Sequence, residues 1–278
     1  MKRGCVLMLI TMALLSNNHV LAQTKKKKER KGEIYFSWGY NAEWYTHSSV
    51  KVNQPELGNN FTLKNVSGHD HPGWDEGLFH LALSIPQYNY RLGYFFNKEK
   101  GWGFEINFDH TKFLIRDNQT IHVTGTLNNA PYDGNVNFRQ VPNAMPGDSS
   151  SYYFLNNGAN FLLFNLVKRW SFFTSKKGWL KIDALAKGGI GPVIPHVENK
   201  FFDQPGNDPH FQLGGWNIGF EGDVRATFFK YAYLEYGNKL DYARYSGLRI
   251  YKGTAKQAFG TYEMILSLGV TVPIGKRG

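Results

Sequence analysis

The densest group of potential metal ligands in the sequence lies around one Pro-Gly turn. His69, Asp70 and His71 precede this turn and Asp75 follows it. Imidazole nitrogens and carboxylate oxygens can coordinate zinc or copper, so His69, His71 and Asp75 are the candidate metal ligands. Adjacent residues on an extended chain point in opposite directions, however, and no helical pattern brings them to one face. A polar surface loop is the preferred interpretation, and we predict no cofactor.

A second candidate for chemistry is a hydrolytic pair. Asp109 and His110 are the residue types that orient and activate a nucleophile in acyl-transfer enzymes. The residues around them alternate between polar and apolar, which predicts a strand and places neighbouring side chains on opposite faces. Asp109 and His110 would then need a bulge to act together, and we do not predict a catalytic dyad.

Composition narrows the class of protein before any element is assigned. The chain has 278 residues, of which 42% are apolar and 16% aromatic. It contains no apolar run of about 18 residues, which argues against a helical membrane protein. The only cysteine, Cys5, excludes a disulfide framework and a cysteine-based zinc site. The formal net charge of +10 lies largely in a basic run at residues 25–31, so it does not indicate nucleic-acid binding.

The first residues predict an export signal. Lys2 and Arg3 form a basic start, Cys5 to Leu15 is apolar, and Ala22 is a small residue suited to cleavage. We therefore predict a signal peptide over residues 1–22, cleaved near Ala22. A flexible basic leader would follow over residues 23–32, and residues 33–278 would form one domain.

From residue 33 onward, apolar and polar residues alternate with a period of two, which predicts strands. The predicted strands lie near residues 33–47, 85–96, 102–115, 152–173, 179–193, 211–229, 232–245 and 257–273.

The connections between the predicted strands are alternately short and long. Short polar turns lie at 97–101, at 174–178 and near Lys230, whereas long polar stretches cover 48–84, 116–151, 194–210 and 246–256. Short turns at one end, long loops at the other and an even strand count are typical of transmembrane barrels. The sequence therefore predicts an all-β fold, an eight-stranded antiparallel up-and-down transmembrane β-barrel. A ten-stranded barrel is the alternative, because residues 60–66, or residues 119–127 with 135–141, could extend or add hairpins.

The two faces of the predicted strands differ in polarity. A soluble sandwich or lipocalin-like barrel, the alternative fold, would bury the apolar face, whereas a membrane barrel turns that face to lipid. On the membrane reading, the charged face points into a narrow lumen, where acids and bases pair and leave a mostly closed barrel. Arg225 is expected to bridge to acids on neighbouring strands. The predicted interior charge network consists of Glu43, Arg91, Glu105, Asp109, Lys181, Asp183, Lys187, Glu221, Asp223, Arg225, Glu235, Lys239, Asp241 and Glu263.

With this pattern of strands, turns and faces, the chain resembles the small outer-membrane β-barrel proteins of diderm bacteria, the broad OmpA-like and OmpW-like class. The resemblance is architectural and covers residues 32–278. It implies a location in the outer membrane, with outer-membrane lipid and the barrel assembly machinery as partners. The implied role is a structural or surface-exposed protein, or a narrow pore. A barrel enzyme that modifies lipid A or phospholipid acyl groups, and an envelope assembly or secretion component, are the alternatives. No specific protein partner and no nucleic acid is implied.

Overall fold

The computed structural model describes residues 32–71, 87–138, 151–202 and 204–275. The predicted signal peptide and all but the last residue of the predicted leader lie outside the described residues. Among the residues described, strands dominate, and a single short 3-10 helix (η1, Pro55–Leu57) is the exception. No helix in this part of the chain is long and apolar enough to cross a membrane.

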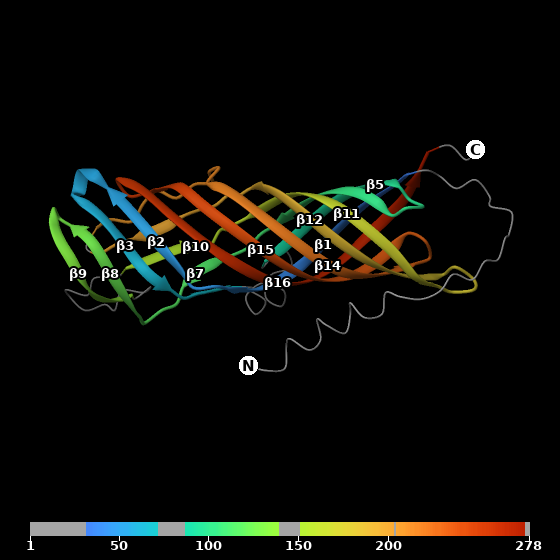
Figure 1. The fold of residues 1–278 in the computed structure, drawn as a ribbon, viewed down its shortest axis with the longest axis horizontal. Helices are drawn as coiled ribbons and strands as arrows, with labels where there is room; N and C mark the ends of the chain where they lie inside the picture. The colour runs from blue at the N-terminus through green and yellow to red at the C-terminus, as the bar shows by residue number, and fades with distance from the viewer. Residues whose placement is uncertain (1–31, 72–86, 139–150, 203, 276–278) are drawn as a thin grey trace. The chain divides into compact units, whose positions relative to one another are not determined.

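Eight long strands close into a ring (Figure 1). They are β1 (Gly32–Tyr45), β5 (Tyr88–Asn97), β6 (Trp102–Asp109), β11 (Phe161–Thr174), β12 (Leu180–Pro192), β14 (Gly215–Phe228), β15 (Ala232–Ile250) and β16 (Gly253–Ile274). Each strand is antiparallel to both neighbours, and the pairing of β1 with β16 closes the ring. The prediction of an eight-stranded up-and-down antiparallel barrel is therefore confirmed.

The three predicted short turns lie together at one end of the ring, which we call the turn end. The turn between β14 and β15 has Phe229 and Lys230 at φ values of 50° and 73°. The Tyr231 N–H donates to the Phe228 carbonyl oxygen at 3.1 Å. Two positive φ values inside such a bond define a type I′ turn, whose twist matches the flanking strands.

Two predicted strands are interrupted, and one predicted loop is absent. The segment predicted as 102–115 divides into β6 and β7 (Phe113–Ile115), and 152–173 divides into β10 (Tyr152–Leu155) and β11. The prediction of a long loop at residues 246–256 is wrong. There β15 and β16 continue to a tight turn at Tyr251 and Lys252, because Leu248 and Ala255 are fully buried and hold both strands in the sheet.

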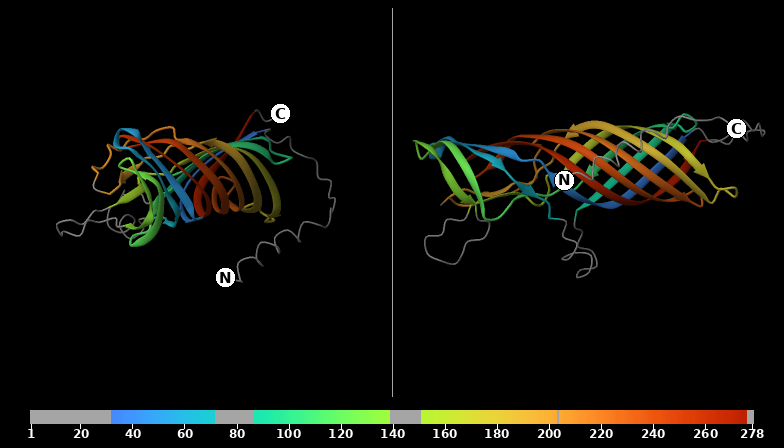
Figure 2. Two further views of the ribbon diagram at one scale, coloured as in Figure 1. Left: turned by 60° about the vertical axis from the view of Figure 1, so that its left-hand side comes forward. Right: turned by 60° about the horizontal axis from the view of Figure 1, so that its bottom comes forward.

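Beyond the other end of the ring, further strands form a second folded region, the extension. It comprises β2 (Ser48–Gln54), β3 (Asn59–Val66), β8 (Gln119–Leu127) and β9 (Ala130–Phe138), which pair in that order outward from β16. A separate four-stranded sheet contains β4 (Gly68–His69), β7, β10 and β13 (Glu198–Lys200). Residues 243–259 of the β15–β16 hairpin complete the extension. Figure 2 shows the β2–β3 and β8–β9 hairpins at this end, so the additional hairpins lengthen the sheet without entering the ring.

The extension has an apolar core built from both of its sheets. Val50, Phe61 and Val123 on the larger sheet pack in one buried cluster with Phe113 and Tyr153 on the smaller sheet. All five are at most 1% exposed. Burial of such side chains is the main source of stability for a folded region in water. The extension is therefore a structured region and not a set of loops.

Candidate functional site

The interior of the ring is the place where the predicted charged residues meet. Thirteen of the fourteen are buried, each at most 6% exposed, and Lys181 near the turn end is half-buried. Strand alternation explains this placement, since each charged residue has apolar neighbours in sequence that face outward. On the outer surface Phe104, Leu266 and Leu268 are 45%, 50% and 63% exposed. An apolar outside and a charged inside are the arrangement of a membrane-spanning barrel.

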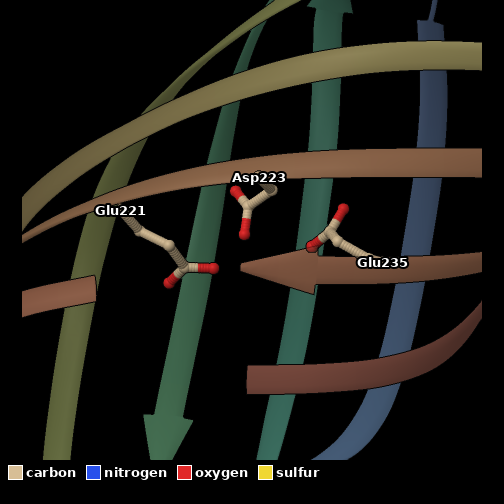
Figure 3. Close-up of side chains that lie close together, drawn as sticks. All are labelled: Glu221, Asp223 and Glu235. Carbon is tan, nitrogen blue, oxygen red and sulfur yellow. The ribbon is translucent and has the colours of Figure 1, made fainter. Parts of the chain in front are cut away.

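Lys187 on β12 lies at the centre of the largest group of carboxylates. Its ammonium nitrogen is 2.9 Å from Glu235 Oε1 and 3.0 Å from Glu221 Oε1. Asp223 at 3.4 Å and Glu105 at 3.3 Å complete the group. Figure 3 shows the carboxylates of Glu221, Asp223 and Glu235 lying close together. One oxygen atom of each lies within 4.8 Å of the others. That spacing suits a metal ion, but the Lys187 ammonium supplies positive charge to the same three carboxylates.

Two further bases extend the network toward the extension. Arg91 Nη2 is 2.9 Å from Glu221 Oε2 and 3.7 Å from Asp109 Oδ1. Lys239 Nζ is 2.5 Å from the other Asp109 oxygen and 3.2 Å from Glu263 Oε1. Glu221 and Asp109 therefore each join two cations, and the ion pairs form one connected network across the lumen. These shared contacts stabilise the folded barrel, because burying a charge without a partner has a high free-energy cost.

Arg225 is held by an acid and by two aromatic rings. Its Nε is 2.5 Å from Glu235 Oε2 on the adjacent strand β15. Its guanidinium carbon is 4.5 Å from the centre of the Tyr35 ring and 4.0 Å from that of Tyr233. A guanidinium at these distances makes favourable cation–π contacts with both rings. The Arg225 guanidinium therefore lies in the lumen between the aromatic rings of Tyr35 and Tyr233.

Tyr35 and Tyr233 occupy space that two glycines provide. A Cβ atom on Gly93 would lie 2.0 Å from Tyr35 Cζ, and one on Gly269 would lie 2.2 Å from Tyr233 Cζ. Each tyrosine pairs directly with its glycine across neighbouring strands. An aromatic ring that covers a glycine of the next strand is a known way to fix strand register. The two glycines thus position the rings that hold Arg225.

An ion pair at the turn end was missed by the sequence reasoning. Arg169 Nη1 is 2.5 Å from Glu33 Oε1, and both residues are buried. The Arg169 guanidinium also lies 3.9 Å from the centre of the Phe95 ring. Continuing the inward alternation from Asn165 to Arg169 along β11 would have found this arginine. The pair adds a charged layer at the turn end of the lumen.

At the opposite end, the lumen meets the apolar core of the extension directly. The Tyr45 hydroxyl donates to the Glu43 carboxylate and lies 2.7 Å from the Lys112 carbonyl oxygen. The Tyr45 ring packs against the extension core. The Phe161 ring, a member of that core, lies 5.3 Å from the Lys239 ammonium. The aromatic side chains of Tyr45 and Phe161 therefore lie where the charged lumen meets the apolar core.

The candidate metal ligands do not assemble around a common point in the part of the chain that the structure describes. His69 Nδ1 lies 2.7 Å from the Asp70 carbonyl oxygen, and His71 Nδ1 lies 3.4 Å from Asn156 Oδ1. Asp75 lies outside the described residues. Burial raises the pKa of the Asp70 carboxyl, although hydrogen bonds to it act in the opposite direction.

The candidate hydrolytic pair is also separated. The Asp109 carboxylate is fully buried in the charge network. The His110 ring instead stacks on Tyr88, with centres 4.6 Å apart, and Nδ1 lies 2.8 Å from Asn160 Oδ1. The two side chains do not share a hydrogen bond, and each has other partners. The geometry therefore provides no reason to assign them a joint catalytic role.

Comparison with known proteins finds similarity of architecture. No family model matches the chain, and no curated protein matches it. The solved structures that the chain resembles include outer-membrane proteins. The outer membrane protein AlkL is 10% identical with a TM-score of 0.38, over 94% of this chain and 99% of that chain. OprG from Pseudomonas aeruginosa is 10% identical with a TM-score of 0.34, over 88% of this chain and 98% of that chain.

Proposed function

We propose that the protein is an outer-membrane barrel with a closed lumen, whose function is to hold the folded extension at the cell surface. The observation that carries this proposal is the position of the apolar core of the extension, immediately next to a lumen filled by ion pairs. A conducting barrel needs a continuous aqueous path, and neither of these two layers offers an obvious one.

The lumen itself supports a closed barrel. Eight strands enclose an interior that side chains can fill. Lys187, Arg91 and Lys239 each contact several carboxylates there, which ties strands on different sides of the ring together. The Arg169–Glu33 ion pair lies in the lumen at the turn end, and the Tyr45 and Phe161 rings lie at the opposite end, beside the apolar core of the extension. This arrangement favours a structural, surface-exposed protein over a narrow pore.

The direction of the barrel follows from its connections. Outer-membrane barrels have short periplasmic turns and longer extracellular loops. The tight turns at 98–101, 175–179 and 229–231 would then face the periplasm. The extension, at the opposite end, would face the outside of the cell.

Planar-bilayer recording tests the closed lumen. We expect the purified full-length protein to insert without producing steady single-channel conductance. The double variant Tyr45→Ala/Phe161→Ala, which removes both aromatic rings, should show more leak than the unmodified protein. Large and steady conductance from the unmodified protein would contradict the closed barrel and favour the pore.

Antibody labelling of intact cells tests the direction of the barrel. An epitope inserted between Asn128 and Asn129, at the β8–β9 turn, should be labelled on intact cells. One inserted at Lys98, in a short turn, should be labelled only after the cells are opened. The reverse pattern would place the extension in the periplasm and end the proposal of surface exposure.

A further inference from the structure

The outward face of the extension carries an unusual concentration of basic side chains. Five exposed bases come from four adjacent strands, with Arg244 and Arg249 on β15, Lys256 on β16, Lys51 on β2 and Lys64 on β3. We call these five residues the basic face. Each base has at least one sequence neighbour in the apolar core, so the alternation that builds the core also places the bases outside. These neighbours are Val50, Leu63, Ala243, Leu248 and Ala255.

The strand register places bases of this face directly against each other. Lys51 and Lys256 are paired across β2 and β16. On its other side Lys51 pairs with Thr62, two residues from Lys64. Like charges directly opposite on a sheet are destabilising. Folding alone therefore does not account for this arrangement.

Acidic partners for these lysines are missing from the described part of the chain. Within it, Lys51, Lys64 and Lys256 form no ion pair, whereas Lys252, at the nearby turn, is 3.6 Å from Glu56. An unpaired cluster of like charge raises the local potential and attracts ions of the opposite sign. The basic face is thus charged in a way that suits an anionic partner.

The β2–β3 side of the basic face is concave and polar. Lys51, Lys64, Ser49, Thr62 and Asn65 help to line a shallow depression of about 580 Å³. Ammonium, hydroxyl and amide groups are all hydrogen-bond donors, and charge-assisted bonds from lysine to phosphate are stronger than neutral ones. The depression therefore offers the donor groups that a phosphate accepts.

The distance of the basic face from the membrane edge indicates which kind of molecule carries the phosphate. Arg244 pairs directly with Trp216, which belongs to the exposed aromatic residues on this side of the barrel, and it follows Tyr242 by two residues. Such aromatic girdles mark the edge of the hydrocarbon layer. With a rise of about 3.3 Å per residue and a tilt of about 45°, Arg244 lies about 5 Å above Tyr242. By the same estimate Lys256, which pairs with Lys51 and lies six residues from Tyr262 along β16, is about 14 Å above the Trp44–Tyr262 pair.

We propose that the basic face binds the phosphate groups of a phosphorylated glycolipid in the outer leaflet next to the barrel. Bases that begin at the membrane edge and continue for about 14 Å match phosphates carried on lipid-linked sugars better than those of a compact headgroup. The proposal rests on the extension facing outward. It adds a lipid-binding surface to a region whose proposed role is otherwise only exposure at the cell surface.

Glycolipid binding by the full-length protein in neutral detergent micelles tests this inference. The probe is diphosphoryl lipid A, with its phosphate-free form as the comparison, and native mass spectrometry measures the fraction of protein with bound lipid. The double variant Lys51→Gln/Lys256→Gln should bind diphosphoryl lipid A about 30-fold more weakly, since each base near an anionic surface contributes about fivefold. The single variant Lys64→Gln should lose about fivefold.

A control variant removes the same charge elsewhere on the extension. Arg116→Gln/Lys252→Gln should bind as the unmodified protein does. Heat-modifiable gel migration should show that the ring of every variant is folded, and unchanged resistance to proteolysis should show the same for the extension. Equal binding by both double variants, or equal binding of phosphate-free lipid A, would overturn the inference. Tighter binding of soluble polyphosphate than of lipid A would also overturn it, in favour of a soluble polyanion. The micelle assay does not depend on sidedness, so a failure here is distinguishable from a failure of the surface-labelling experiment.

Discussion

Strand β16 passes through two regions of the molecule and reverses its polarity between them. In the ring, Leu266 faces outward and is 50% exposed, while Glu263 faces inward and is fully buried. In the extension, Lys256 faces outward and is exposed, while Ala255 and Phe259 face inward and are buried. The even-numbered positions point outward in both regions. The strand geometry therefore stays constant while the chemistry of its two faces is exchanged.

The exchange indicates which medium surrounds each region. An apolar outer surface is stable against hydrocarbon, and a polar outer surface is stable against water. The ring can bury charge inside because the charges pair, as around Lys187, while the extension buries hydrocarbon as a water-soluble domain does. We therefore place the membrane boundary at the change of pattern near Thr261 and Tyr242, where exposed Trp44 and Tyr262 also pack with ring centres 5.6 Å apart.

The largest effect should come from removing the central cation of the ring. Lys187→Met leaves four carboxylates without their shared ammonium, and breaking a buried ion pair costs about 3–5 kcal/mol. We expect a matching fall in the unfolding free energy in detergent, and partial recovery at low pH because protonation removes the uncompensated charge. Lys252→Met, which breaks an exposed pair with Glu56, should cost at most about 1 kcal/mol. Equal stability of the two variants would show that the lumen is hydrated enough to screen its charges.

The second largest loss of stability should come from a core substitution in the extension, and it should be confined to that region. Phe61 is 1% exposed, and its ring lies 5.6 Å from those of both Phe201 and Phe202. Phe61→Ala should cost about 3 kcal/mol through lost burial and a cavity. We expect faster proteolysis of the extension, while heat-modifiable migration shows an intact ring. Phe104→Ala, on the lipid-facing surface, is the control and should change neither measurement as much. Loss of the ring in the Phe61 variant would mean that the two regions fold as one unit.

The ring was predictable from sequence because its alternation is long and uniform. Phe104, Ile106 and Phe108 alternate with Glu105 and Asn107 without interruption, and a period of two assigns both the strand and its faces. The interior residues follow from the same rule. The Glu33–Arg169 pair was not found because the two residues are 136 positions apart and meet across the lumen. Such a meeting depends on ring closure and strand stagger, which a single strand pattern does not contain.

The extension was much harder to predict, for a reason that the comparison of the two regions explains. Along β15 the apolar residues shift from outward positions such as Leu240 to inward positions such as Ala243 and Tyr245. A pattern followed on one face appears to end at that point, so the hairpin beyond it was expected to be a loop. Strands β2 and β3 carry few apolar residues each, as at Val50 and Val52. Their burial depends on the second sheet, whose position no local pattern indicates.

The smallest effect tests the exchange of faces within one strand. Leu266 and Thr254 both point outward on β16, twelve positions apart, the first in the ring and the second in the extension. An arginine on the lipid face costs about 2–4 kcal/mol near the membrane midplane, whereas an exposed surface change in water stays within about 0.5 kcal/mol. Leu266→Arg should therefore reduce the amount of folded protein in the membrane and lower its unfolding free energy in lipid vesicles. Thr254→Arg, with the same added side chain on the same face, should leave both quantities unchanged. If Thr254→Arg were the more harmful of the two, the membrane boundary would lie above residue 254 and the extension would be a membrane-embedded part of the barrel.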